Sequence, residues 1–400
     1  MAVENKKARY MKFQGFARPD NRVGVRNTVL VMATADCAEP AAQMIVKGIE
    51  GAVAVTQYEG CIAMETVPTL VGVAKNPNIA AVLLVSMGCE GLQPEPIVAE
   101  ISQSGKPVEV VKIQEAGSTR RAVARGRELV QGMVEEAGRQ YRQTFDLSHL
   151  AIGVKCCGSD TTSGIAANPA IGIMADMLVD AGASVVMIEP IEAIGAEEFL
   201  AQRAANTRVK QQILKWVADE EKRWTVPGAS VDFMCQGNIE GGLTTLEEKS
   251  MGAIHKGGHR PIKGVLKNKK DYLEPIPPGG GFYLQEGTHV GLHSMTYLAA
   301  AGVNIIVFAT GRGGVLGHAI CPVIKVTGNP ETWARMKEDM EVNASTIMEG
   351  KESIEGVGKR IFDKVLAVAS GELTISEQLG LNNFAVWKYD PRLEALLGLL

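Results

Sequence analysis

The sequence predicts an α/β fold made of two doubly wound, mainly parallel-sheet domains, with a Rossmann-like variant in the second. Its apolar, β-rich runs are continuous rather than alternating, as in strands that are covered on both faces. Segments with helical periodicity lie between these runs, so strands and helices alternate along the chain. With 400 residues, 46% of them hydrophobic, the chain can fill two or three cores.

The predicted strands follow the apolar runs in order. They are Thr28–Thr34, Ala80–Ser86, Val108–Ile113, Leu150–Val154, Ser184–Ile188 and Val303–Thr310, with a further strand near Pro322–Val326. Helical patterns predict helices over Glu39–Ile49, Pro94–Ser102, Thr119–Ala137, Asn168–Ala181, Gly195–Asn206, Glu331–Asn343 and Ile354–Ser370.

These elements divide the chain into a first α/β domain, residues 1–147, and a second, catalytic α/β domain, residues 148–400. Residues 227–287 are rich in Gly, Pro and Lys and show little periodicity. A loop region that long in a compact domain is usually functional or an interface, so we expect an irregular insertion there.

The charge excludes some partners. A net charge of −4 gives no general electrostatic reason to bind nucleic acid or an anionic membrane, so any anionic substrate must be met by local cations. The sequence contains no run of about 18 apolar residues and no secretory leader. We therefore expect a cytoplasmic protein that binds neither nucleic acid nor membrane.

The seven cysteines are dispersed and odd in number, which argues against a disulfide framework. Cys235 is expected in the core. Five cysteines lie beside Gly, Pro or an acid and are candidate metal ligands: Cys37, Cys61, Cys89, Cys156 and Cys321. The alternative is that they are buried structural thiols. Thiolates from separate loops suit iron or an iron–sulfur cluster, whereas neighbouring acids such as Glu189 and Glu192 suit Fe²⁺, Mn²⁺ or Mg²⁺.

Five polar loops follow predicted strands: "TADC", "SMGCEG", "KCCGSDTTSG", "EPIE" and "TGRGG". Ligands of open α/β sheets bind beyond the carboxyl ends of the strands, so we expect these loops to converge on one mouth. "GRGGVLG" lacks the full dinucleotide fingerprint, which disfavours a nicotinamide cofactor.

Charged side chains near these loops can meet an anion. Arg312 can bind a carboxylate or sulfonate through paired N–H donors, or can instead serve a surface ion pair. Arg18, Arg22 and Arg26 lie close together in the sequence, so they repel one another unless anionic groups of the protein or of a ligand lie between them. Asn238, Lys249, Ser250, His255 and Lys256 lie between glycines, and the histidines are either solvated loop residues or general acid/base groups.

The chain resembles the altronate/galactarate dehydratase family. The resemblance is carried by "GFARPDNRVGVRN", "NPNIAAVLLVSMGCEGL", "VKCCGSDTTSGIAANPAIG", "GNIEGGL…EKSMGA…KGG", "AAAGVNIIVFATGRG" and "PVIKVTGNPETWARM", which span residues 15 to 336. It implies a metal-dependent lyase, usually with iron, that eliminates a β-substituent from a small anionic 2-hydroxy acid to give a 2-keto acid. The first domain is implied to dimerise, and the likeness suggests the large subunit of an altronate-like sugar-acid dehydratase.

Residues at the family's motif positions supply the predicted site. The expected catalytic residues are Asp160, Lys249, His255 and Arg312, and the expected substrate-binding residues are Arg22, Arg26, Ser159, Asn238, Thr296 and Arg312. The expected ligands of Fe²⁺, of Mn²⁺ or Mg²⁺, or of an iron–sulfur cluster are Cys37, Cys61, Cys89, Cys156, Cys321 and Glu189.

The sequence departs from the family pattern twice. The small β-clip module that opens single-chain members is missing, which implies a separate small subunit. Gln57 stands where sugar-acid dehydratases usually have a histidine. Hydroxide leaves poorly without a general acid, whereas sulfite needs little help, so the alternative is the large (beta) subunit of a sulfolactate sulfo-lyase that releases sulfite and pyruvate. A non-catalytic thiol redox sensor built on Cys156 and Cys157 is a remote alternative.

Overall fold

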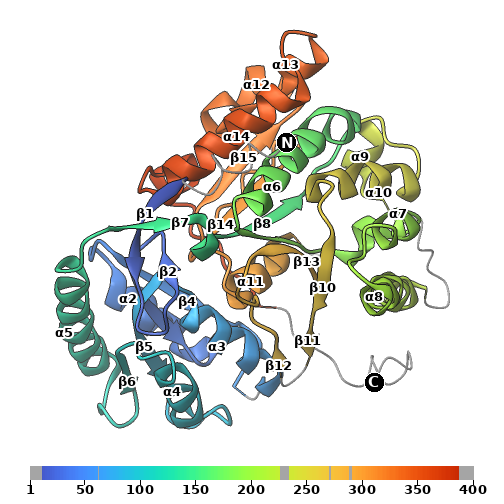
Figure 1. The fold of residues 1–400 in the computed structure, drawn as a ribbon. Helices are drawn as coiled ribbons and strands as arrows, with labels where there is room; N and C mark the ends of the chain where they lie inside the picture. The colour runs from blue at the N-terminus through green and yellow to red at the C-terminus, as the bar shows by residue number, and fades with distance from the viewer. Residues whose placement is uncertain (1–10, 62, 226–233, 270–271, 288–290, 387–400) are drawn as a thin grey trace.

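A computed structural model describes residues 11–61, 63–225, 234–269, 272–287 and 291–386. The chain forms two parallel sheets with helices between and around them (Figure 1).

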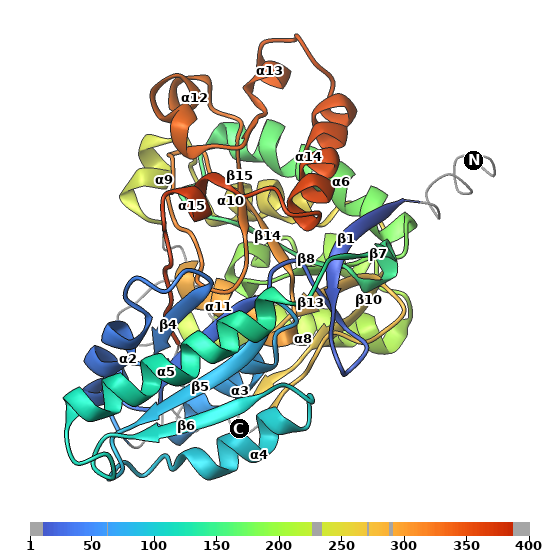
Figure 2. The ribbon, with the colours of Figure 1, turned by 90° about the vertical axis from the view of Figure 1, so that its left-hand side faces the viewer.

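The first sheet has four parallel strands in the order β4-β3-β5-β6. They are β3 (Thr28–Ala33), β4 (Ala52–Thr56), β5 (Ile79–Ser86) and β6 (Val108–Lys112). Helices α2 (Glu39–Val46) and α5 (Thr119–Gly138) pack on one face, and Figure 2 shows α5 lying along it. Helices α3 (Val67–Lys75) and α4 (Pro94–Ser102) pack on the other. Covered faces explain why these strands read as continuous apolar runs.

The second sheet has seven parallel strands in the order β10-β13-β9-β8-β14-β15-β16. They are β8 (Ala151–Cys156), β9 (Ser184–Met187), β10 (Ile262–Leu266), β13 (Gly281–Gln285), β14 (Ile305–Ala309), β15 (Val323–Thr327) and β16 (Val342–Asn343). One face is covered by α6 (Asn168–Asp180), α8 (Thr207–Trp224) and α14 (Ile354–Ala369), and the other by α11 (Gly291–Ala301).

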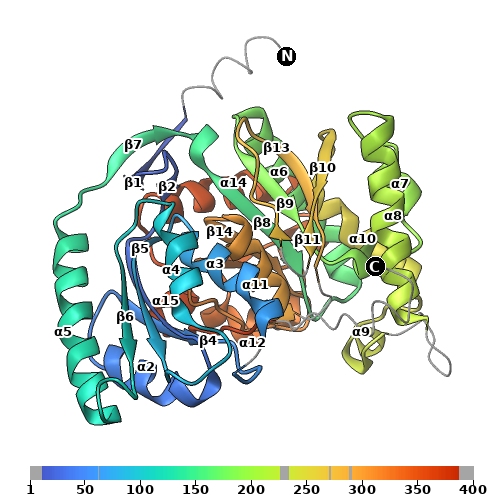
Figure 3. The same ribbon diagram turned by 90° about the horizontal axis from the view of Figure 1, so that it is seen from below.

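Helices α3 and α11 lie between the two sheets and join them (Figure 3). A Cβ atom on Gly72 of α3 would stand 2.6 Å from the carbonyl oxygen of Ala300, so the two backbones touch there. The Asn76 side chain donates hydrogen bonds of 2.7 Å and 2.9 Å to the carbonyls of Ala299 and Val303. The two sheets therefore share a buried, hydrogen-bonded contact.

Smaller elements complete the part of the chain that the structure describes. Strands β1 (Lys12–Ala17), β2 (Val23–Gly24) and β7 (Gln143–Asp146) form an antiparallel sheet, and β11 (Asn268–Lys269) pairs with β12 (Tyr272–Leu273). The remaining α-helices are α7 (Glu197–Ala201), α9 (Gln236–Glu240), α10 (Leu246–Ile254), α12 (Pro330–Met336), α13 (Ser345–Met348) and α15 (Ile375–Gln378). Among the described residues, no helix combines the length and the apolar character needed to cross a membrane.

The predicted α/β class and all seven predicted strands are confirmed, with ends that differ by a few residues. The expectation of an irregular insertion at 227–287 is wrong, because this stretch supplies β10 and β13 of the second sheet as well as α9 and α10. The helix predicted over Gly195–Asn206 is the short α7, and the long helix α8 begins after it. The division into two domains at 147 stays a prediction.

Candidate functional site

A buried ion pair stands at the carboxyl ends of two neighbouring strands of the second sheet. Lys155 lies near the end of β8 and Glu189 follows β9, and Lys155 Nζ is 3.0 Å from Glu189 Oε1 with the side chains 0% and 3% exposed. Glu189 has a left-handed backbone with φ of 78°, which is rare for a residue other than glycine and clusters at functional sites. The turn after β9 thus holds the backbone of Glu189 in a costly conformation, and with it the position of the carboxyl group.

A second buried ion pair lies beside the first. Lys256, which follows α10, has its Nζ 2.6 Å from Glu192 Oε2. The Cys156 thiol donates to Glu192 Oε1 at 3.0 Å. Because successive side chains of a strand point to opposite faces, Lys155 and Cys156 lead to opposite sides of the sheet edge. The end of β8 therefore carries one ion pair on each side.

Burial sets the protonation of these groups. Burial, followed by the negative charge of Glu192, raises the pKa of Glu189 to about 7, against the pull of Lys155. Burial also acts to raise the pKa of Glu192, but the charges of Lys256 and Lys249 outweigh it and leave that pKa below its ordinary value. Burial and the charge of Glu192 raise the pKa of the Cys156 thiol to about 12. Two neighbouring carboxyls with divergent pKa values are typical of acid/base sites.

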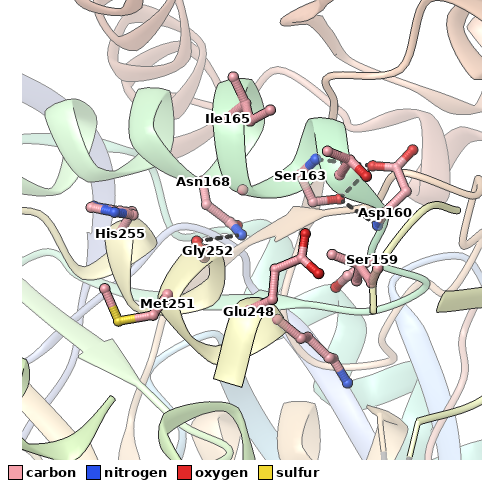
Figure 4. A pocket seen from close by; sticks show the side chains of 13 residues that line it. Ser159, Asp160, Ser163, Ile165, Asn168, Glu248, Met251, Gly252 and His255 are labelled. Atoms are coloured by element: carbon pink, nitrogen blue, oxygen red, sulfur yellow. Dashed lines mark hydrogen bonds between the residues drawn. The ribbon is translucent and has the colours of Figure 1, made fainter. Parts of the chain in front are cut away.

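A small pocket of about 260 Å³ lies beyond the end of β8 (Figure 4). It is lined by the loop after β8 and by α10, through Ser159, Asp160, Thr161, Ser163, Gly164, Ile165, Asn168, Leu243, Glu248, Lys249, Met251, Gly252 and His255. The buried atoms Ser159 Oγ and Asn168 Oδ1 have no hydrogen-bond partner among the described residues. Since buried polar atoms without partners are costly, these two point to a polar ligand in the pocket.

Lys249 connects the pocket with the buried ion pairs. It lines the pocket, and its positive charge acts on Glu192 and, more weakly, on Cys157. The predicted residues Ser159, Asp160, Lys249 and His255 are thus brought together. Burial, with the charges of His259 and Arg203, lowers the pKa of His255, which favours its neutral imidazole.

Asp160 organises the loops around the pocket. Its carboxylate accepts hydrogen bonds from the Thr162 hydroxyl at 2.7 Å, the Ser163 amide at 2.9 Å and the Asn329 side chain at 2.7 Å. With its side chain buried and its oxygens engaged, this geometry favours a positioning role over the predicted catalytic one.

Arg312 stands at the point where the strand order reverses between β8 and β14. Its backbone amide donates to the Gly158 carbonyl at 2.8 Å, and its guanidinium Nη2 is 3.2 Å from Glu240 Oε2. Such switch points are the usual ligand crevices of open α/β sheets. With side chains 41% and 52% exposed, the Arg312–Glu240 pair forms a polar rim that an anionic ligand can reach.

The other predicted substrate-binding residues lie outside the pocket lining. The Asn238 side chain donates to the Ser159 carbonyl at 2.8 Å and so supports the loop. Thr296 is buried on α11, with its hydroxyl 3.3 Å from His318 Nε2. Arg22 pairs with Asp20, and Arg26 pairs with Glu377. The structure gives Arg22, Arg26 and Thr296 these contacts instead of bringing them to the pocket.

The six predicted metal ligands fall into three places. Cys37, Cys61 and Cys89 are exposed on the loops after β3, β4 and β5 of the first sheet, whereas Cys156 and Glu189 belong to the buried network of the second. Cys321 is buried, and its thiol donates to the Val303 carbonyl at 3.1 Å. In the described part of the chain, no group of three or more His, Cys, Asp and Glu side chains is arranged to hold a metal ion. The six therefore do not fit one metal centre.

The loops that carry the three exposed cysteines are nevertheless tied together. The Gln57 side-chain amide donates to the Thr34 carbonyl at 3.2 Å, the Thr34 hydroxyl donates to Glu90 Oε1 at 2.7 Å, and the Gly91 amide donates to the Cys61 carbonyl at 2.8 Å. The five predicted loops therefore lie at the carboxyl ends of two different sheets, rather than around one mouth as expected. Cys235, expected in the core, is exposed, because it precedes the surface helix α9.

Sequence reasoning assigns no role to Lys155 and leaves Lys256 out of the predicted site. A lysine inside an apolar strand, as in "IGVKCC", is a signal that can be read, because lysine is almost never fully buried without a partner. From the sequence, their partners Glu189 and Glu192 are candidates only as metal ligands.

The sequence is similar to known proteins along most of its length. The family model described as D-galactarate/Altronate dehydratase, C-terminal, matches residues 147–391, and that of the D-galactarate dehydratase/Altronate hydrolase second domain matches residues 15–138. The chain is 33% identical to the (2R)-sulfolactate sulfo-lyase subunit beta of Chromohalobacter salexigens, over 94% of this chain and 96% of that one.

Two dehydratases show similar likeness. The chain is 31% identical to the altronate dehydratase of Bacillus subtilis, over 94% of this chain and 77% of that one. It is also 31% identical to the galactarate dehydratase (L-threo-forming) of Escherichia coli, over 93% of this chain and 75% of that one.

Proposed function

The chain belongs to the D-galactarate/altronate dehydratase family, and on that premise we propose that it eliminates a β-substituent from a small 2-hydroxy carboxylate to give a 2-keto acid. Its relatives are named dehydratases and a sulfo-lyase, so the chain is a lyase. The proposal concerns the substrate, the leaving group and the residues that act.

The observation that carries the mechanism is the buried Lys155–Glu189 pair. The proton on the carbon next to a carboxylate is weakly acidic, so its removal needs a base whose pKa lies near the working pH. The pKa of Glu189, raised to about 7, meets this requirement. Lys155 holds the carboxyl in place and offsets negative charge that develops beside it.

The elimination step takes one proton from the substrate and moves two bonding pairs. Glu189 takes the proton from C2, and the electrons of the broken C2–H bond form the C2–C3 double bond. The substituent leaves C3 with its bonding electrons, and the resulting enol tautomerises to the 2-keto acid. Lys249 and Arg312 supply the local positive charge that an anionic substrate needs in a protein of net charge −4.

The pocket positions the substrate. Ser159 Oγ and Asn168 Oδ1 have no partner among the described residues, so the Ser159 hydroxyl can donate to a substrate carboxylate oxygen and Asn168 Oδ1 can accept from a substrate hydroxyl. Glu189 is not among the residues that line the pocket, so the proposal places the substrate's oxygens in the pocket and its C2 carbon beyond it, at the end of β8. Fixing the substrate in that orientation against the base supplies a large part of the barrier reduction in such reactions.

The first candidate leaving group is water, released from a sugar acid, because two of the relatives reported above are named dehydratases. The C3 hydroxyl leaves as water only when a general acid protonates its oxygen. Lys249 and His255, which both line the pocket, are the groups that we assign to deliver this proton.

The second candidate leaving group is sulfite, which needs no such proton. It is favoured by the match to nearly the full length of the sulfo-lyase subunit and by the departure from the family pattern at Gln57. An amide side chain is not a general acid, and Gln57 is buried among hydrogen bonds to the Thr34 and Gly60 carbonyls and from the Glu59 amide.

Iron is a further part of the proposal, supported by the family resemblance, and no step above depends on it. The three exposed thiols on linked loops, Cys37, Cys61 and Cys89, are softer donors than the buried carboxylates and suit iron by ligand type. We also propose a separate small partner subunit, since the sulfo-lyase relative is named a subunit beta, and a homodimer of the large chain.

The test is an assay of 2-keto acid formation, with and without ferrous iron, on altronate, galactarate and sulfolactate, including substrates deuterated at C2. Loss of deuterium to water together with keto-acid formation supports the proposal. If keto acid forms while the C2 deuterium is retained, elimination through a C2 base is wrong. The assay includes a candidate small subunit in a parallel arm.

A further inference from the structure

Glu240, at the end of α9, pairs with Arg312 at the rim of the candidate site. Arg312 Nη2 is 3.2 Å from Glu240 Oε2, and Glu240 Oε1 accepts a hydrogen bond of 3.4 Å from the Gln236 side chain. The proposed reaction uses the charge of Arg312 but gives Glu240 no role. A carboxylate held against the arginine that is to meet an anionic substrate therefore needs an explanation.

The backbones that carry this pair are tied to the loop after β8. The Arg312 amide donates to the Gly158 carbonyl at 2.8 Å. The Thr161 amide and hydroxyl both donate to the Gly241 carbonyl at 3.1 Å, one residue after Glu240. The positions from which Arg312 and Glu240 project are thus set, and rearrangement at the rim is left to their side chains.

The same segments press against Asp160, which lines the pocket (Figure 4). A Cβ atom on Gly241 would lie 2.7 Å from Asp160 Cβ, and a Cβ atom on Gly311 would lie 2.1 Å from Asp160 Cγ. These two glycines are the chain neighbours of Glu240 and Arg312. The ion pair therefore stands beside the pocket wall, where it meets the far end of a ligand that extends out of the pocket on this side.

Exposure makes the pair easy to displace. Both side chains are exposed, and exposed ion pairs are weak. A guanidinium has five N–H donors, of which the contact with Glu240 uses one, so Arg312 can also receive a ligand anion. That anion comes close to the Glu240 carboxylate, and like charges repel. A hydroxyl group meets no such repulsion, because it can donate a hydrogen bond to the carboxylate.

We propose that Glu240 is a specificity-determining residue that occupies Arg312 and so lowers the affinity of the site for substrates with an anionic group at both ends, relative to substrates that end in a hydroxyl group. The substrates that it disfavours are dicarboxylates and carboxylate–sulfonates, and those that it favours are polyhydroxy monocarboxylates. This role rests on the proposed function, because it requires the substrate to reach Arg312.

Three variants isolate the effect. Glu240→Gln removes the charge and keeps an oxygen that can accept from a hydroxyl group. Its matched control is Glu128→Gln on α5, because Glu128 also forms an exposed ion pair, with Arg125, and the net charge changes by the same amount. Arg312→Met, alone and combined with Glu240→Gln, tests whether the effect passes through the guanidinium.

The experiment compares galactarate, which has a carboxylate at each end, with altronate, which has the same chain length but ends in a hydroxyl group. Their dissociation constants are measured by calorimetry with ferrous iron present and with Glu189→Gln in every protein, so that turnover does not interfere. Thermal unfolding checks that each variant is folded, and keto-acid formation by the unmodified chain is assayed separately.

We expect Glu240→Gln to tighten galactarate binding by about fivefold, the factor that corresponds to an exposed ion pair, and to leave altronate binding unchanged. Glu128→Gln is expected to change neither. In the Arg312→Met background the gain from Glu240→Gln is expected to disappear, because the second carboxylate then has no cation to bind at the rim.

The role of Glu240 is overturned if galactarate binding is unchanged in Glu240→Gln, if altronate or the Glu128→Gln control gains as much, or if the gain persists in Arg312→Met. If both acids bind but the unmodified chain forms no keto acid, the proposed function fails, whereas the ratio of the two affinities still decides the role of Glu240. If neither acid binds, both proposals are wrong.

Discussion

Lys155 Nζ and Glu189 Oε1 lie 3.0 Å apart at the ends of adjacent strands, with both side chains withdrawn from water. Unlike a carboxylate in a surface ion pair, Glu189 is not permanently ionised at neutral pH, because burial and the nearby Glu192 raise its pKa to about 7. A carboxyl that gains and loses its proton near neutral pH beside a fixed cation can serve as a proton acceptor. The following predictions test that role and its surroundings.

Replacing Glu189 by Gln is expected to lower kcat by about 10²- to 10⁴-fold, the usual contribution of a general base. The matched control is Glu341→Gln, because burial also raises the pKa of Glu341 while its carboxylate accepts from the Lys325 and Ile375 amides. Steady-state kinetics on folded proteins measure both. A Glu189→Gln enzyme with wild-type kcat contradicts the assignment.

The pH dependence follows from the same carboxyl. Glu189 acts as a base only when it is deprotonated, so kcat/KM is expected to rise tenfold per pH unit below pH 7 and to level off above its pKa of about 7. An unperturbed glutamate would place this midpoint near 4.5. A measured midpoint below pH 5 argues that another group limits the reaction.

Replacing Lys155 by Met removes the cation and leaves the buried carboxyl. We expect a loss of about 3–5 kcal/mol in the free energy of unfolding at pH 8, as for other broken buried pairs. Because the pKa of Glu189 is raised in the folded state, ionisation above it opposes folding, and the loss is expected to shrink at pH 5. Chemical denaturation at both pH values measures it, and Lys155→Met/Glu189→Gln should be more stable than Lys155→Met alone.

Iron content tests the thiols. In anaerobically purified protein, Cys→Ser at Cys37, Cys61 and Cys89 is expected to lower bound iron, because these thiols are exposed on linked loops. Cys235→Ser, another exposed thiol, is the control. Cys321→Ser is expected to leave iron unchanged, since that thiol is buried against a carbonyl. Elemental analysis showing equal iron in all five variants rules out this ligand set.

Arg312→Lys keeps the charge at the rim but loses the paired N–H donors. We expect kcat/KM to fall by the equivalent of about 1–3 kcal/mol, with iron content unchanged. Arg335→Lys, an exposed arginine of α12, is the matched control. Wild-type kinetics in Arg312→Lys mean that the guanidinium serves only its contact with Glu240.

The strands that could be predicted are those whose apolar runs stand out from their surroundings, such as β5 and β14. The sequence does not predict strand β13, because its five residues follow a Pro and Gly cluster that is typical of a loop. The strand is nevertheless buried along its whole length. Strand β4, "AVAVT", is short, and its pairing with β3 decides its conformation more than its own preferences do. Tertiary contact supplied what local pattern lacked.

Part of the candidate site follows from the sequence. The rule that ligands bind beyond strand ends points to the loops after β8 and β14, and Ser159 and Lys249 line one pocket. A single sequence does not say which strands share a sheet, so cysteines from two sheet edges were joined into one ligand set. Lys155 was overlooked because its role depends on a carboxyl 34 positions away in the chain, as the numbering of the pair shows.

The close approach of Gly72 to Ala300 bears on how the molecule loses its structure. Asn76 and Asn78, just before β5, donate four hydrogen bonds to the carbonyls of Ala299, Val303, Asn304 and Ile320. Separating the two sheets therefore breaks these four bonds together and exposes the apolar faces of α3 and α11 to water. We therefore expect heat to unfold the two halves together, in one cooperative transition.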